Sequence, residues 1–334
     1  CMCCLWSLIF LLFGIVLCLW LCLRVFLWFR NSYKVPGKEG YEECILITGC
    51  DSGIGRNTAL RLCKNGYTVF AACLFEKSFS ALLDESASFS GTIVPIQVDI
   101  RKEASVQNMA RAVDSELQKS NRRLFAVVNN AGVITNGPIE MQTMQEVEFQ
   151  FDVNVLGQVR VIQETTKFIR ESGGRIVNTV SVAGRTTTGA LGAYSGSKHA
   201  MEAITDAIRF ELKPWKVSVS AIEPGVIDTE LARSMSRNVD MWNKLRPGAT
   251  EVYPLLQKQT ERTGKLGIIG EPVDTVTDAI MHAITSAHPK TRYLVGADAK
   301  LLAFLKWACS DRTFDIISEL SPVLADMRLK QKQK

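Results

Sequence analysis

The sequence is poor in groups that bind metals or form regular disulfides. Only three histidines occur in 334 residues, and no CxxC pair lies near a histidine cluster, so no metal site is predicted. Ten cysteines are present, but five fall within the first 22 residues and the other five have no regular spacing. An odd, unpatterned set of this kind indicates reduced thiols in a compartment such as the cytosol.

A strong charge of one sign is also absent. The formal net charge is +5, with 39 basic residues interleaved among 34 acidic ones. Nucleic-acid-binding domains carry a basic patch or stripe, commonly with aromatic residues, and the sequence contains no such stripe. We therefore expect no nucleic-acid partner.

Long hydrophobic runs are confined to the N-terminus. From Leu5 to Phe29 the only charged residue is Arg24, and about 20 apolar residues are enough to cross a bilayer. Tryptophans stand near both ends of the run, where aromatic rings favour the membrane interface. We predict that residues 1–30 form a transmembrane helix that anchors the chain in lipid. The alternative, a cleaved signal peptide, has a shorter apolar region and a small-residue cleavage site.

The rest of the chain divides into a linker (31–43), one domain (44–298) and a partly apolar C-terminal segment with a basic tail (299–334). The expected strands are Cys44–Thr48, Thr68–Cys73, Thr92–Val98, Leu124–Asn129, Arg175–Val180, Val217–Ile222 and Arg292–Val295. The expected helices are Arg56–Asn65, Ala104–Lys119, Met144–Arg170, Tyr194–Leu212 and Val273–Ser286. This alternation predicts an α/β fold with a Rossmann-type, doubly wound parallel sheet of about seven strands. Residues 229–270 break the alternation and are expected to shape a substrate site.

A glycine-rich turn follows the first expected strand, in the sequence Thr48-Gly49-Cys50-Asp51-Ser52-Gly53-Ile54-Gly55. Glycines allow a tight turn and a close approach of the backbone to a pyrophosphate. The next helix presents free N–H groups and its positive dipole end to phosphate. The spacing alone also fits a bare turn before a helix. Its position favours a dinucleotide site, because ligands of parallel sheets bind at the carboxyl ends of the strands.

Further motifs follow in an order that resembles the short-chain dehydrogenase/reductase family. The matching segments are the glycine loop, Asp99, Asn129-Asn130-Ala131-Gly132, Ser181, Tyr194-Ser195-Gly196-Ser197-Lys198, and Pro224-Gly225 with Thr229. The similarity extends from Cys44 to Val295 and implies a nicotinamide cofactor. The implied cofactor-binding residues are Gly49, Asp51, Ser52, Gly53, Ile54, Gly55, Asp99, Ile100, Asn129, Ala131, Gly132, Tyr194, Lys198, Pro224, Gly225 and Thr229. The implied catalytic residues are Ser181, Tyr194, Lys198 and Asn154.

Tyr194 and Lys198 are one turn apart on the expected helix and share a face. Oxidation of an alcohol requires a base for the hydroxyl proton, and a free tyrosine, with a pKa of about 10, is about three units from suiting neutral pH. The Lys198 ammonium and a positive nicotinamide ring favour the phenolate. By the resemblance, Tyr194 is the general acid/base and Lys198 lowers its pKa and binds the nicotinamide ribose. Ser181 then holds the substrate oxygen, and Asn154 positions a relay water.

The choice between NAD and NADP depends in this family on the end of the second strand, which usually carries an acid for NAD or a base for NADP. This sequence has Cys73 and Leu74 there. Asp51, within the glycine loop, would repel a ribose 2′-phosphate, whereas Lys77 favours one if it is not simply a solvated charge. NAD is therefore favoured over NADP.

Within the family, the leader, the glycine loop, Ser197-Lys198-His199-Ala200 and Gly296–Leu302 are similar to the membrane-anchored retinol and hydroxysteroid dehydrogenase branch. This resemblance implies interconversion of an apolar alcohol (a retinoid, a steroid or a similar lipid) and its carbonyl by hydride transfer. Two alternatives stay open: a hydroxybutyrate-type dehydrogenase, and a catalytically silent relative that acts as a binding protein. Leu301–Trp307 is interpreted either as the end of a core helix or as a membrane-facing lip of the substrate channel.

Location and assembly are predicted from weaker features. Arg30, Lys34 and Lys38 follow the leader, and basic residues beside a membrane segment tend to stay cytoplasmic. The tail, residues 330–334, has lysines third and fifth from the end. This spacing resembles the dilysine signal of endoplasmic-reticulum proteins, although a solvated basic tail looks the same. We predict an endoplasmic-reticulum anchor with a cytosol-facing catalytic domain. The family resemblance is also compatible with a homo-oligomer.

Overall fold

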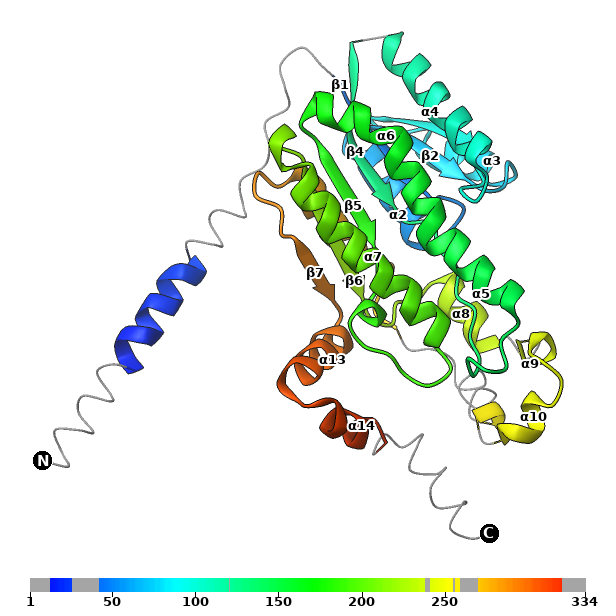
Figure 1. Cartoon of the computed structure of the whole chain (residues 1–334). Coiled ribbons are helices and arrows are strands. Elements are labelled where there is room, and N and C mark those ends of the chain that lie inside the picture. The colour runs from blue at the N-terminus through cyan, green and yellow to red at the C-terminus, as the bar shows by residue number, and fades with distance from the viewer. Residues whose placement is uncertain are drawn as a thin grey trace, which may run out of the picture.

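Seven strands form one parallel sheet, in the order β3-β2-β1-β4-β5-β6-β7 (Figure 1). The computed structural model describes residues 13–25, 42–119, 121–237, 241–254, 256–258 and 270–319. The strands are β1 (Glu42–Thr48), β2 (Thr68–Cys73), β3 (Thr92–Gln97), β4 (Arg122–Asn129), β5 (Arg175–Thr179), β6 (Ser218–Pro224) and β7 (Arg292–Val295). The predicted Rossmann-type sheet of a single α/β domain is confirmed.

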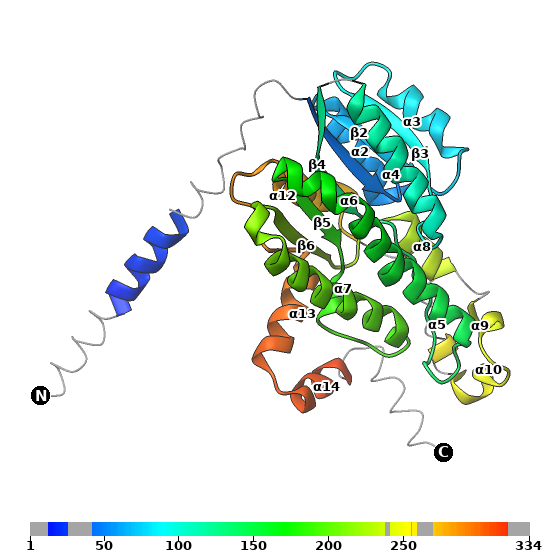
Figure 2. The same cartoon turned by 45° about the horizontal axis from the view of Figure 1, so that its top comes forward.

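Both faces of the sheet are buried under helices. Cys44 and Leu46 of β1 face one core cluster, while Ile45 and Ile47 face the other, and all four are fully buried. Successive side chains of a strand point to opposite faces, so a strand that is apolar at every position needs a helical layer on each side. One layer contains α2 (Gly53–Lys64), α3 (Ser78–Ser86) and α12 (Val273–Thr285). The other contains α4 (Glu103–Gln118), α6 (Gln158–Ser172) and α7 (Gly192–Glu211), as Figure 2 shows.

One expected helix is interrupted. The stretch predicted as a single helix, Met144–Arg170, consists of α5 (Met144–Phe151), a π-helical turn η1 (Asp152–Gly157) and α6. Gly157, at the end of this turn, packs closely against the loop that follows β3, since an added Cβ would lie 2.8 Å from Ile100 Cγ1. Single π-turns inside helices often mark functional sites, and this one carries Asn154.

Several helices were not predicted. In the helix α3 only Leu82 and Ser86 are buried, so its sequence shows little of the helical spacing of apolar residues on which the prediction depends. Two C-terminal helices, α13 (Ala297–Ala308) and α14 (Asp311–Glu319), follow β7. The interpretation of Leu301–Trp307 as the end of a core helix is wrong, because on α13 Leu301 is 58% exposed and Trp307 is 82% exposed. The segment after β6 forms α8 (Glu230–Arg237), α9 (Met241–Lys244) and α10 (Ala249–Val252).

The predicted transmembrane helix is not found. Residues 13–25 are helical, but no helix in the described part of the chain is both long and apolar enough to cross a membrane. The remainder of the predicted anchor and most of the linker, residues 1–12 and 26–41, lie outside the described residues, as does the basic tail.

Candidate active site

A cavity of about 670 Å³ opens at the carboxyl ends of the strands, where a doubly wound sheet binds its ligands. Most of the predicted site residues line it: Gly49, Asp51, Ser52, Gly53, Ile54, Asp99, Ile100, Ala131, Gly132, Ser181, Tyr194, Lys198, Pro224, Gly225 and Thr229. Gly55, Asn129 and Asn154 are not among the lining residues. Segments far apart in the sequence therefore converge on one site.

The glycine loop has the backbone shape that its sequence predicts. Gly49 and Gly53 have φ angles of +73° and +56°, which side chains rarely tolerate. Gly55 contributes by close packing, because a Cβ there would lie 2.3 Å from the Gly49 carbonyl oxygen and 2.5 Å from Asn130 Nδ2. The loop is therefore compact where it borders the cavity.

The first turn of α2 fits the pyrophosphate of a dinucleotide. Ser52 precedes the helix without capping it through its side chain, and the turn contains no acidic residue. The free N–H groups at this helix start and its positive dipole end are thus available to an anion. The lining residues Gly49 to Ile54, together with Lys198 and Thr229, would hold the phosphates and the nicotinamide half of such a cofactor.

Asp51 crosses from the glycine loop to the end of β2. Its carboxylate accepts hydrogen bonds from the Leu74 backbone N–H (2.8 Å), the Phe75 backbone N–H (3.0 Å) and the Ser78 hydroxyl (2.9 Å). An acid therefore lies at the end of β2 even though Cys73 and Leu74 occupy that position in the sequence. Asp51 fixes the loop that follows β2 and places negative charge in the cavity wall.

Asp99 lines the same end of the cavity and is paired with Arg101. The Arg101 guanidinium contacts both carboxylate oxygens, at 2.9 and 2.7 Å, and this interaction lowers the pKa of Asp99. The implied role of Asp99 in cofactor binding stays a prediction. Arg101 was not predicted as a lining residue, although it stands two positions after Asp99 in the sequence.

The two asparagines after β4 have separate places. Asn129 is fully buried, and its Nδ2 donates to Asn178 Oδ1 (2.8 Å) inside the sheet. Asn130 lines the cavity, and its Nδ2 donates to the Thr48 carbonyl (3.0 Å), which holds the glycine loop. Sequence reasoning therefore chose the wrong neighbour. The alternation of side chains along β4 would have separated the two.

Asn154 supports the cavity wall from behind. Its Oδ1 accepts from the Val133 N–H (2.8 Å), and its Nδ2 donates to the Val133 carbonyl (2.9 Å) and to Ser197 Oγ (3.2 Å). Both amide hydrogens thus have protein partners in a fully buried position. The observed contacts fix the backbone at Val133, and the relay-water role stays a prediction.

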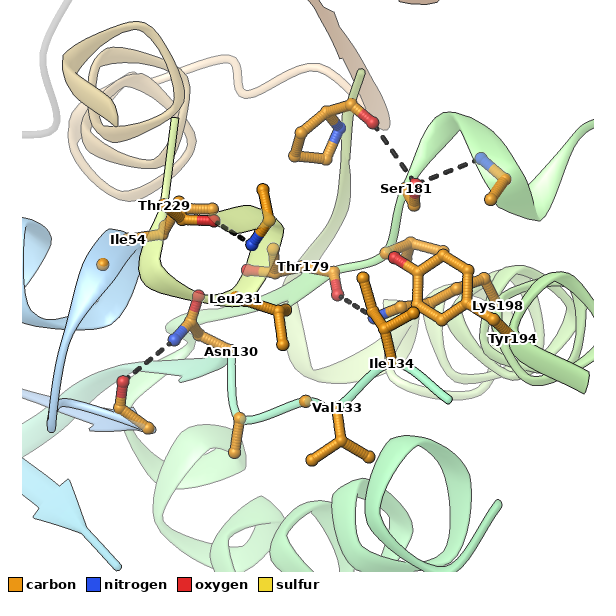
Figure 3. Close-up of a pocket in the computed structure, with 18 of the residues that line it drawn as sticks. Ile54, Asn130, Val133, Ile134, Thr179, Ser181, Tyr194, Lys198, Thr229 and Leu231 are labelled. Atoms are coloured by element: carbon orange, nitrogen blue, oxygen red, sulfur yellow. Dashed lines mark hydrogen bonds between the residues drawn. The ribbon is translucent and has the colours of Figure 1, made fainter. Parts of the chain in front are cut away.

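The other three predicted catalytic side chains meet in the cavity (Figure 3). Lys198 lies one turn after Tyr194 on α7, and its Nζ is 5.8 Å from the centre of the Tyr194 ring. That Nζ donates to the Thr179 carbonyl at the end of β5 (3.1 Å). Ser181 follows β5, and its Oγ donates to the Pro224 carbonyl at the end of β6 (3.3 Å). The predicted shared face of Tyr194 and Lys198 is confirmed.

Burial controls the two titratable groups. It raises the pKa of the Tyr194 phenol above its usual 10, and a hydrogen bond with Ser181 opposes part of this effect. It lowers the pKa of the Lys198 ammonium to about 8, against the attraction of the Glu202 carboxylate. The Lys198 ammonium donates to the Thr179 carbonyl, and the predicted lowering of the Tyr194 pKa by Lys198 together with a positive nicotinamide ring stays a prediction. At neutral pH the phenol is protonated and the lysine is mostly charged.

Further lining residues are apolar and were not predicted individually. They include Val133, Ile134, Val182, Leu191, Val226, Leu231 and Leu302. Leu231 comes from α8, in the segment expected to shape the substrate site, and Leu302 comes from α13. Apolar lining residues in the same cavity as a Ser–Tyr–Lys group suit a ligand with one polar oxygen on an apolar body.

Comparisons with known proteins agree with this geometry. Residues 43–240 match the short chain dehydrogenase family. The chain is 35% identical to retinol dehydrogenase 16 of Mus musculus over 290 residues, which covers 85% of this chain and 88% of that protein. It is 33% identical to 3beta-hydroxysteroid dehydrogenase dhs-16 of Caenorhabditis elegans, also over 290 residues, which covers 84% of this chain and 75% of that protein.

Solved structures share the fold. A short chain dehydrogenase/reductase from Burkholderia phymatum in complex with NAD has a TM-score of 0.66 at 23% identity, over 80% of this chain and 94% of that chain. A short chain dehydrogenase from Burkholderia cenocepacia J2315 in complex with NADP has a TM-score of 0.63 at 22% identity, over 84% and 99%. Identities this low bear on the fold alone. The family match and the relatives above show that the chain belongs to the short-chain dehydrogenase/reductase family.

Proposed function

We propose that the protein interconverts an apolar alcohol, such as a retinoid or a steroid, and its carbonyl. The observation that carries the proposal is that Ser181, Tyr194 and Lys198 line one cavity together with a set of apolar side chains. Relatives more than 30% identical carry the names retinol dehydrogenase and 3beta-hydroxysteroid dehydrogenase, which supports this substrate class.

The roles of the residues follow from their positions. A bound nicotinamide cofactor would supply or accept the hydride. Tyr194 donates a proton to the substrate oxygen in reduction, for which its protonated state at neutral pH is suited, and removes that proton in oxidation. Ser181 Oγ lies beside the phenol and holds the same oxygen. Lys198 provides positive charge under the site and binds the cofactor ribose.

Purified protein tests this proposal directly. It should oxidise all-trans-retinol or a hydroxysteroid in the presence of NAD, with formation of NADH followed at 340 nm. Hydroxybutyrate serves as the control substrate, because its second polar end would lie unpaired against the apolar lining residues. Turnover of hydroxybutyrate alone would favour the small-acid alternative. NADH binding without turnover of any alcohol or carbonyl would favour the silent binding protein.

We further propose NAD as the preferred cofactor. Asp51 contributes a negative charge to the cavity wall and already occupies the N–H groups of Leu74 and Phe75. Those N–H groups are the donors at the end of β2 that a ribose 2′-phosphate would otherwise use. A phosphate placed there would meet a like charge and find its donors taken.

Asp51→Asn should raise kcat/KM with NADP by about 10-fold and change kcat/KM with NAD by less than threefold, on the scale of one like-charge contact near the surface. The amide keeps an acceptor for the loop N–H groups but removes the charge. Asp84→Asn, an exposed acid on α3, is the matched control and should alter neither value. A wild-type enzyme that already prefers NADP would show that this interpretation of Asp51 is wrong.

A location on the cytosolic face of the endoplasmic reticulum is also proposed. One support is the apolar N-terminal sequence, in which Phe13 is 67% exposed. The other is the group of basic residues that follows this apolar sequence. On α13, Leu301, Phe304 and Trp307 expose apolar side chains beside Leu302, which lines the cavity. This arrangement suits entry of a substrate from lipid.

Protease added to sealed microsomes should then digest the catalytic domain without detergent, as followed by an antibody against the domain. A lumenal protein of the same microsomes is the control for sealing. Protection of the domain until detergent is added would place it in the lumen and contradict the proposed location.

A further inference from the structure

An ion pair with a fully buried carboxylate and a partly exposed guanidinium lies close in sequence to the proposed catalytic serine. Glu223, the residue of β6 before Pro224, has no solvent exposure. Arg185 follows the short 3₁₀ turn η2 (Val182–Gly184), which begins immediately after Ser181. The pair therefore joins the two segments that carry Ser181 and Pro224.

Two short contacts join the Arg185 guanidinium to the Glu223 carboxylate. Arg185 Nη2 donates to Glu223 Oε1 (2.8 Å), and Arg185 Nε lies 2.7 Å from Oε2 as an ion pair rather than a well-directed hydrogen bond. Arg292 of β7 approaches Glu223 Oε1 at 3.2 Å with its Nε and also bonds Glu202. The Glu223 carboxylate thus lies between two guanidinium groups.

The same two segments form the polar edge of the cavity. Ser181 Oγ donates to the Pro224 carbonyl (3.3 Å) and accepts from the Ala183 N–H (3.1 Å). Gly225, the next residue, lines the cavity with Pro224. A shift of η2 relative to β6 would therefore move the serine hydroxyl relative to the residues expected to hold the nicotinamide.

Stability alone does not account for this pair. Removing a carboxylate from water carries a large desolvation penalty, and a buried ion pair replaced by well-packed apolar side chains often leaves a protein equally or more stable. Two contacts between a planar guanidinium and a carboxylate do, however, fix orientation more tightly than apolar packing. The geometry of the neighbouring segments is what such a pair determines.

We propose that Arg185 and Glu223 are positioning residues that hold the Ser181 hydroxyl in register with the end of β6. The inference rests on the proposed function, because it assigns the pair an effect on turnover that is exerted through Ser181. Neither side chain belongs to the set that lines the cavity, so neither is expected to touch the substrate.

A double-mutant cycle with Ser181→Ala tests this inference. In the presence of Ser181, Arg185→Met should lower kcat by about 10- to 100-fold, as expected when a reacting group is displaced by a fraction of an ångström to 1 Å. In the Ser181→Ala background, Arg185→Met should change kcat, measured in both backgrounds by single turnover, by less than about threefold, because the group that Arg185 positions is gone. Arg185→Lys, which keeps the charge, should fall between wild type and Arg185→Met.

Glu223→Gln should behave as Arg185→Met does, and Arg185 provides the test if Glu223→Gln does not fold, since the arginine is partly exposed. The matched control is Arg123→Met, which removes a mostly buried ion pair with Glu43 at the opposite end of the sheet (2.6 Å). It should leave kcat unchanged in both backgrounds. Equal losses from Arg185→Met with and without Ser181 would overturn the inference and leave the proposed function intact. A wild-type protein without turnover would overturn both.

Discussion

Tyr194→Phe should lower kcat by about 1,000-fold or more while the Kd for NADH stays within about twofold of wild type. The phenol is protonated at neutral pH because burial raises its pKa, and it lines the cavity beside Ser181, so we assign it the proton that the substrate oxygen takes up. Loss of a positioned acid/base group typically costs 10²–10⁴ in rate, and Phe keeps the ring that packs above Lys198. Binding and chemistry should therefore separate in this variant.

The measurement is a pair of assays on one preparation: single-turnover oxidation of the best alcohol, and quenching of protein fluorescence by NADH. Tyr67→Phe is the matched control, because Tyr67 packs against the core cluster at the other end of the sheet. It should leave both values unchanged. Near-native turnover in Tyr194→Phe would refute the assignment of the general acid/base.

The sheet could be predicted from the sequence because its central strands contain runs of buried apolar residues, such as Cys44–Ile47 of β1 and Val69–Cys73 of β2. β2 and β7 have the predicted ends, Thr68–Cys73 and Arg292–Val295, and β7 is bounded by Thr291 and Gly296. The interruption at Asp152–Gly157, where Gly157 packs closely against Ile100, could not be predicted. Apolar periodicity contains no information about such a contact.

The site could be predicted as a set of segments but not as a set of side-chain roles. The glycine loop, Ser181, Tyr194 and Lys198 meet as expected, because parallel strands bring their carboxyl ends to one edge. The partner of each polar group depends on distances that a sequence does not give. Asp51 reaches β2 in this way, and Lys198 turns to a backbone carbonyl.

Burial of Lys198 leads to a prediction about stability. Lys198 is 5% exposed, and its pKa falls from 10.5 to about 8 on burial. A lysine whose pKa is lowered in the folded state binds fewer protons than in the unfolded state between these values, so the stability of the wild-type protein rises with pH from about 8 to 10.5. Below pH 8 the folded protein carries the full penalty, which for this shift is about 3 kcal/mol.

Lys198→Met should remove that penalty and abolish function. At pH 7 we expect the free energy of unfolding to rise by about 1 to 3 kcal/mol, the lower figure allowing for the Thr179 carbonyl left without its charged donor (a loss of about 1.5–3 kcal/mol). At pH 9.5 the advantage should shrink by about 2 kcal/mol, because the wild-type lysine is then neutral when folded. Like Tyr194→Phe, this variant should lose nearly all turnover, but unlike Tyr194→Phe it should also bind NADH more weakly.

Urea unfolding at pH 7 and pH 9.5, followed by tryptophan fluorescence, measures both stabilities. Lys64→Met, at an exposed lysine in the last turn of α2, provides the comparison for loss of a lysine at the surface and should retain turnover. Lys198→Met could instead be less stable than wild type at pH 7, with the same difference in free energy of unfolding at pH 9.5. That result would show that burial of the Lys198 ammonium does not lower the stability of the wild-type protein. The pH dependence is decisive because only a group that titrates between the two pH values can produce it, whereas a packing defect would destabilise the protein equally at both.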